Sequence, residues 1–148
     1  MTRAKRMQPV VQAVGHDERE CAARLAIAER RARDAECRHA ELDAYQTDYA
    51  SGLERRIAAG ITASELRDFR AFLARLADAL HAQSRLVSQA SAECEAAREA
   101  WSRAARRAKA IGHVVGRWQL EERREHERRE QRDLDERALE RARSRTRR

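Results

Sequence analysis

Apolar residues between Leu66 and Trp118 recur at alternating steps of three and four positions. One series falls on every seventh residue and comprises Leu66, Leu73, Leu80, Val87, Cys94, Trp101, Ala108 and Val115. A second series, offset by three residues, comprises Phe69, Leu76, Gln83, Ala90, Ala97, Ala104, Ile111 and Trp118, and only Gln83 is polar. A repeat of 3.5 residues keeps one side of a helix facing a partner helix, so this stretch predicts an α-helical coiled coil.

A weaker heptad pattern precedes this stretch. It runs from Val11 to Leu53 in one series and from Val14 to Tyr49 in the other, with polar residues at positions 18, 39 and 46. Pro9 suits the first turn of a helix, where the missing N–H is not needed. The pattern predicts a first helix over about residues 9–58.

Signals for the end of one helix and the start of the next coincide at residues 59–62. Gly60 can adopt the left-handed conformation that ends a helix. Thr62 and Glu65 have the spacing of a capping box, and Ile61 with Leu66 has that of a hydrophobic staple. The sequence therefore predicts a tight helical hairpin, with a second helix over about residues 63–143.

The lengths of the two patterns agree with this hairpin. If the helices pair antiparallel about Gly60, Trp118 at the end of the second pattern lies opposite the start of the chain. Residues 119–148 lack the heptad pattern and contain nine acidic residues and eleven arginines. The predicted fold is thus all-α: one domain (1–148), a long antiparallel two-helix coiled-coil hairpin with a protruding, charged C-terminal helix, the unpaired tail (119–148).

Composition agrees with a rod of helices. Charged residues make up 39% of the chain and aromatic residues 4%, which is unsuited to a globular core. No apolar run approaches the ~18 residues of a membrane span, and no signal sequence is recognisable, so a cytoplasmic protein is expected. The net charge is +7, but arginines alternate with acidic residues almost throughout, which is typical of solvated helix faces.

Candidate chemistry is sparse. The five glycines are scattered, Cys21, Cys37 and Cys94 lack metal-type spacing, and Glu125-His126-Glu127 does not fit the H-E-x-x-H motif. His39 and His81 would lie at similar heights in the hairpin without a third ligand. Together with Gln46 and Gln83, His39 is instead expected to form a polar layer that fixes the register. No enzyme activity, metal or cofactor is expected.

Two aromatic residues fall beside the heptad series. Tyr45 and Phe72 would lie at similar heights near the turn. With Leu42, Tyr49, Leu76 and Ala79 they form an apolar stripe that a single partner helix covers only in part. The stripe is either a broadened helix–helix contact or a docking site, since exposed apolar patches mark partner sites.

In order, spacing and total length, these features resemble the FliJ family of flagellar type III export stalk and chaperone proteins. The resemblance rests on Met7-Gln8-Pro9-Val10-Val11, Leu42-x-x-Tyr45-x-x-x-Tyr49, Gly60-Ile61-Thr62, Leu66-x-x-Phe69-x-x-Phe72-Leu73-x-x-Leu76, Trp101, the basic step from Arg106 to Lys109, and Glu130-Gln131-Arg132-x-x-Asp135-Glu136. It covers essentially the whole chain.

The resemblance implies a non-enzymatic stalk of the flagellar export apparatus, similar to the central stalk of rotary ATPases. It implies binding to the export ATPase ring and docking on the cytoplasmic domain of the export gate, which would couple ATP hydrolysis and proton-driven export. It also implies a role as a general export chaperone, with export substrate chaperones as further candidate partners, and peripheral association with the inner-membrane apparatus at the flagellar base. Its gate-contacting positions fall on Leu42, Tyr45, Tyr49, Phe72, Leu76 and Ala79. Arg38 and Gln83 differ from the family pattern and are left out. The tail arginines Arg123, Arg124, Arg128, Arg129 and Arg132 are the candidates for the ATPase contact.

Two other readings remain open. A stalk of a virulence-type secretion system would show the same helical pattern. A nucleic-acid-binding coiled coil would use the basic ends and would bind with a steep salt dependence, although the interleaved acidic residues argue against it.

Overall fold

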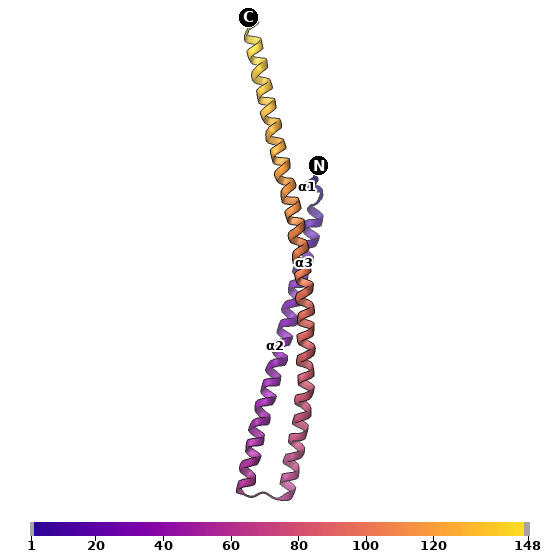
Figure 1. Ribbon diagram of the computed structural model, residues 1–148, viewed down its shortest axis with the longest axis vertical. Helices are drawn as coiled ribbons and strands as arrows, with labels where there is room; N and C mark the ends of the chain where they lie inside the picture. Colours follow the sequence, from indigo (N-terminus) through magenta and orange to yellow (C-terminus); the bar gives the residue numbers. More distant parts are fainter. Residues whose placement is uncertain (1, 147–148) are drawn as a thin grey trace. The chain divides into compact units, whose positions relative to one another are not determined.

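The computed structural model describes residues 2–146, which form three helices: α1 (Arg3–Arg6), α2 (Gln8–Ala59) and α3 (Ala63–Thr146). No strand occurs among these residues, and the predicted all-α helical hairpin is confirmed (Figure 1). The chain divides into two compact units. The turn unit comprises Glu20–Ser102, and the terminal unit combines Met1–Arg19 with Arg103–Arg148.

In the turn unit, α2 and α3 lie side by side and antiparallel. Leu53, Leu76 and Cys94 are its buried apolar residues, each less than a tenth exposed, and all fall on the heptad series. The Gln83 side chain crosses between the helices and donates from Nε2 to the Ala35 carbonyl oxygen at 2.9 Å. This polar residue of the heptad series therefore ties the two helices together in the middle of the unit.

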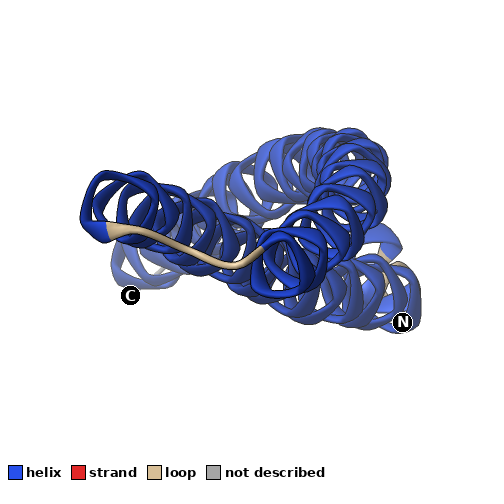
Figure 2. Ribbon diagram, turned by 90° about the horizontal axis from the view of Figure 1, so that it is seen from below, coloured by secondary structure: helices blue, strands red, loops and turns tan. Residues whose placement is uncertain are grey.

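The turn of the hairpin is closed by the predicted residues. Gly60 has φ +99°, a left-handed conformation, and its N–H donates to the Ile57 carbonyl at 3.2 Å. The Thr62 N–H donates to Glu65 Oε2, and the Glu65 N–H donates to Thr62 Oγ1, each at 3.2 Å. Figure 2, seen from the turn end, shows this short loop connecting the two helices. The capping box satisfies two backbone donors at the start of α3.

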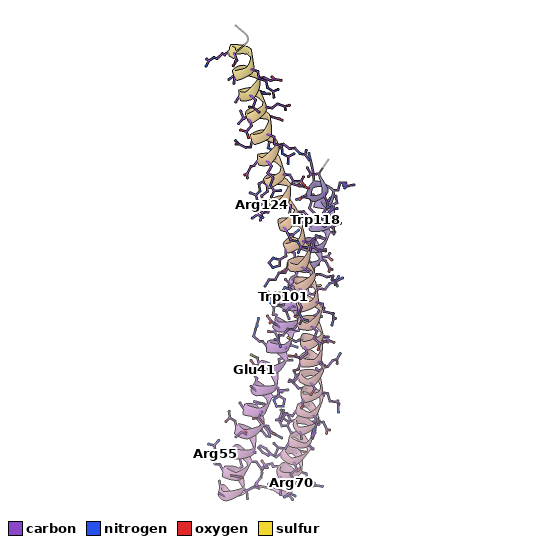
Figure 3. All side chains as sticks on the ribbon, turned by 45° about the horizontal axis from the view of Figure 1, so that its top comes forward. Glu41, Arg55, Arg70, Trp101, Trp118 and Arg124 are labelled. Carbon is purple, nitrogen blue, oxygen red and sulfur yellow. The ribbon has the colours of Figure 1, made fainter. Side chains whose placement is uncertain are left out.

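In the terminal unit, the N-terminal segment packs on α3. Ala4, Ala104 and Val115 are buried, with Ala104 only 1% exposed. The Arg3 guanidinium lies over the Trp118 ring, 5.1 Å from its centroid, and Trp118 is labelled in Figure 3. The Ala4 N–H donates to Glu122 Oε1 at 3.1 Å. The start of the chain thus lies beside Trp118, as antiparallel pairing requires.

The short helix α1 was not anticipated. Thr2 caps it by accepting from the Lys5 N–H, and the chain leaves the helix at Met7. Pro9 has no N–H to donate back to Lys5, so the hydrogen-bond ladder is interrupted just before α2. The predicted helix start near residue 9 lies one residue after the start of α2 at Gln8, and the break between the two helices falls at Met7.

Beyond Glu122, α3 continues to Thr146 with every residue exposed. Its side chains pair along the helix: Arg129 lies 3.6 Å from Glu125, and Gln131 donates to Asp135 at 3.1 Å. Such pairs contribute about 0.2–0.5 kcal/mol each. Residues 123–146 therefore show local pairing of side chains and no burial of apolar side chains.

Candidate partner-binding surface

Four aromatic rings gather near the turn. Tyr49 is central: its ring centroid lies 4.4 Å from that of Phe72, 5.2 Å from Phe69 and 6.2 Å from Tyr45. Tyr45 meets Phe72 edge-on at 6.3 Å. Aromatic pairs at these distances contribute about 0.5–1.5 kcal/mol beyond their area burial. The cluster therefore has a fixed shape that is built from both helices.

The cluster is covered unevenly. Tyr49 and Phe72 are half-buried, whereas Tyr45 is 52% exposed. Phe69 belongs to the heptad series and Tyr45 does not, so the rings extend from the helix–helix contact out to the solvent on one side. The contact between the two helices therefore leaves about half of the Tyr45 side chain exposed to solvent.

The six residues predicted to contact the gate are brought together on this side, but at different depths. Ala79 is exposed, Leu42 is half-buried, and Leu76 is only 7% exposed. Leu76 and Tyr49 therefore support the surface from beneath, while Tyr45 and Ala79 form its outer part. We call the surface formed by Leu42, Tyr45, Phe72, Leu76 and Ala79 the apolar patch.

Two shallow depressions open on the apolar patch. One is lined by Phe72, Arg75, Leu76 and Ala79, and the other by Arg38, Glu41, Leu42, Tyr45 and Gln83. Arg38, Glu41, Arg75 and Gln83 are not among the six residues that the sequence predicts to contact the gate. A usable signal was present, because Arg38 stands one heptad before Tyr45 and so falls on the same side of α2.

The five tail arginines are not gathered in this way. Arg123, Arg124, Arg128, Arg129 and Arg132 are all exposed on α3. Arg129 pairs with Glu125, and the Arg123 Nε donates to the Gln119 carbonyl at 3.4 Å. These arginines form an exposed, charged surface along the helix.

Other chemistry is limited in the described residues. Residues 2–146 contain no group of three or more His, Cys, Asp or Glu side chains placed to hold a metal ion. Cys21, Cys37 and Cys94 are free thiols, and Cys94 is buried between the helices. None of the helices, as far as they are described, is both long and apolar enough to cross a lipid bilayer.

The fold and this surface define a class of protein: an antiparallel coiled-coil hairpin that presents aromatic side chains on one side. A family model described as "Flagellar FliJ protein" matches residues 3–147, nearly the whole chain. The chain therefore belongs to the flagellar FliJ family, and it is a component of the flagellar protein export apparatus. No significant match is found among curated proteins or among solved structures.

Proposed function

We propose that this protein is the non-catalytic stalk of the flagellar export apparatus, contacting the export gate through the apolar patch and the export ATPase through its terminal unit. It would act in the cytoplasm, associated peripherally with the inner-membrane apparatus, and assist export as a chaperone. Family membership supports the export role and favours a flagellar over a virulence-type system. The single observation behind the gate contact is the half-exposed aromatic surface of Tyr45 and Phe72 near the turn.

The apolar patch suits a protein partner. Tyrosine is enriched at protein interfaces because one end of its side chain is apolar and the other end forms hydrogen bonds. The aromatic cluster holds Tyr45 and Phe72 in place before binding, so little side-chain entropy remains to be lost. Rigid aromatic anchors of this kind are typical of interface hot spots.

The gate contact is tested with Tyr45→Ala and Phe72→Ala in the full-length protein. Binding to the purified cytoplasmic domain of the export gate is measured by calorimetry, and helicity by circular dichroism. We expect each substitution to weaken binding by about tenfold or more, as hot-spot residues do, with helicity kept. Unchanged affinity in both variants, with both folded, would contradict the gate contact.

The ATPase contact is proposed for the five exposed tail arginines. A helix that carries alternating charges and almost no apolar surface binds a partner weakly and reversibly through electrostatics. Such a contact would let a stalk change its position within a ring. This proposal draws on the exposure of residues 123–146 and on family membership.

Removal of residues 119–148 tests this contact. We expect loss of binding to the export ATPase and loss of any stimulation of its ATP hydrolysis, while gate binding is retained. A second variant, with the five arginines replaced by glutamine, keeps the helix and removes only the charge. If both variants bind and stimulate the ATPase like the unmodified protein, the tail has no part in the contact.

A further inference from the structure

The apolar patch is longer than the set of residues assigned to it. On α3, Phe72, Ala79 and Leu86 are spaced seven residues apart and so fall on one side of the helix. Leu86 is 53% exposed, as much as Tyr45. At 1.5 Å per residue, Phe72 and Leu86 are separated by about 21 Å along the helix, a length of roughly four turns.

Leu86 belongs to the same surface as the depression around Gln83. Leu86 follows Gln83 by three residues on α3, and because side chains on a helix lean toward its N-terminus, the Leu86 side chain is expected to lean toward the turn that contains Gln83. Gln83 lines the depression shared with Leu42 and Tyr45, and its side chain is held by the bond to the Ala35 carbonyl. Leu86 therefore extends the apolar surface away from the hairpin turn.

A row of carboxylates borders this surface on α2. Asp34, Glu41 and Asp48 are also spaced seven residues apart, all are exposed, and Glu41 lines the depression at Tyr45. Figure 3 labels Glu41 on α2. None of the three forms an ion pair in the part of the chain that the structure describes. Arg38, in the same depression, and Arg31, one heptad before it and also exposed, offset two of these three negative charges, so a net charge of −1 remains along this border.

The opposite flank of the surface differs in charge. On α3 the residue beside Phe72 and Ala79 in the depression is Arg75, and the residue one heptad later is Ala82. The surface thus has an apolar centre and a row of carboxylates along α2, and its α3 side carries Arg75, with Asp68 one heptad before it. A bound segment would meet carboxylates along α2 and Arg75 on α3, which favours one orientation of the segment.

From these features we infer that the surface formed by the apolar patch and Leu86 binds an amphipathic α-helix of the partner, about four turns long, with basic residues along the side that faces Asp34, Glu41 and Asp48. A pair of helices has no unpaired backbone N–H or C=O groups along its length, so an added β-strand would gain no backbone hydrogen bonds. A third helix instead buries its apolar side chains in the groove between two helices. The inference rests on the proposed gate contact and specifies what the gate would present.

Two variants test the inferred helix site against the cytoplasmic domain of the export gate. Leu86→Ser shortens the apolar surface, and we expect about tenfold weaker binding. The triple variant Asp34→Asn, Glu41→Gln and Asp48→Asn removes the acidic border. It should weaken binding several-fold at low salt and flatten the salt dependence, because exposed charges act through screened attraction.

Matched controls separate these effects from general changes in stability or charge. Ile57→Ser also replaces an exposed apolar residue by serine, at a side chain that is 49% exposed. By its heptad position, Ile57 lies on the other side of the helix pair. A second triple variant, Glu36→Gln, Asp43→Asn and Glu54→Gln, removes three exposed charges outside the row. Both controls should bind like the unmodified protein. If they weaken binding as much as the test variants, the inference is wrong.

The helical nature of the bound segment is tested by a photo-cross-linking side chain placed at Ala79. Adducts on gate residues three and four positions apart would show a helix, and adducts on alternate residues would show a strand and overturn the inference. Self-association that Leu86→Ser abolishes would assign the surface to a second copy and would also overturn it. If Tyr45→Ala and Phe72→Ala weaken gate binding but Leu86→Ser and the acidic triple variant do not, the gate contact stands and the helix site fails.

Discussion

Replacing Gly60 by alanine isolates the conformational requirement of the hairpin turn. A Cβ built at Gly60 has no heavy atom within 4 Å, so the substitution introduces no steric conflict with neighbouring groups. Its effect comes from the backbone alone, because Gly60 has φ +99° and an alanine rarely adopts a positive φ. The left-handed conformation costs an L-residue about 1–2 kcal/mol, so we expect Gly60→Ala to destabilise the hairpin by that amount.

Thermal and urea unfolding, followed by circular dichroism at 222 nm, measure this loss. A change of 1 kcal/mol shifts the melting temperature of a chain of this size by roughly 2–4 °C. Gly52→Ala is the matched control because it lies in α2 near the same turn, and its added Cβ would meet only Arg55 Nη2 at 3.9 Å. There, alanine should stabilise the helix by about 1 kcal/mol. If Gly60→Ala and Gly52→Ala change stability in the same direction, the turn does not depend on the left-handed residue.

Three further substitutions follow from particular contacts. Thr62→Ala removes the acceptor for the Glu65 N–H and should cost about 1 kcal/mol in urea unfolding, and an unchanged midpoint would contradict the capping box. Gln83→Leu replaces a polar residue between the helices and should raise the melting temperature. It should also allow other helix registers, which would appear as additional species in size-exclusion chromatography. A lower melting temperature with a single species would contradict this reasoning. Trp118→Ala removes the ring beneath Arg3 and should speed amide exchange in residues 3–14 at least tenfold, and unchanged exchange would show that Trp118 does not hold the N-terminal segment.

The helix–helix contact could be predicted from the sequence because it depends on a period. Every heptad position between Val11 and Trp118 is buried or half-buried except Trp101, whose exposure is 37%. For Trp101 the period identified its position on the contact side but not how much of its side chain is covered. The turn was predictable for a different reason, since Gly60, Thr62 and Glu65 act through local backbone geometry.

The surface could be predicted only in part. Tyr45 and Phe72 were identifiable because large apolar residues stand out beside the heptad series. The burial of Leu76 followed from its heptad position, but Phe72 and Ala79, at equivalent positions beside the series, differ in exposure through their packing across the pair. Arg38, Glu41 and Gln83 become part of the surface only through the side chains opposite them. Helix α1 was not predicted either, because one of its first backbone donors, the Ala4 N–H, is satisfied by Glu122, which is distant in the sequence.

The hairpin itself is tested most directly by a distance between spin labels on its two helices. The labels are placed at Ala44 and Ala74, in a variant with Cys21, Cys37 and Cys94 replaced by alanine. These two positions lie on opposed stretches of α2 and α3, because the nearby pairs Tyr49 with Phe69 and Ala35 with Gln83 are in contact. Pulsed electron resonance should give a distance below about 25 Å, given helix axes 8–10 Å apart, and the distance should persist when labelled protein is diluted with unlabelled protein. A distance near 45 Å, as expected for a single straight helix over these residues, or a short distance that disappears on dilution, would contradict the intramolecular hairpin.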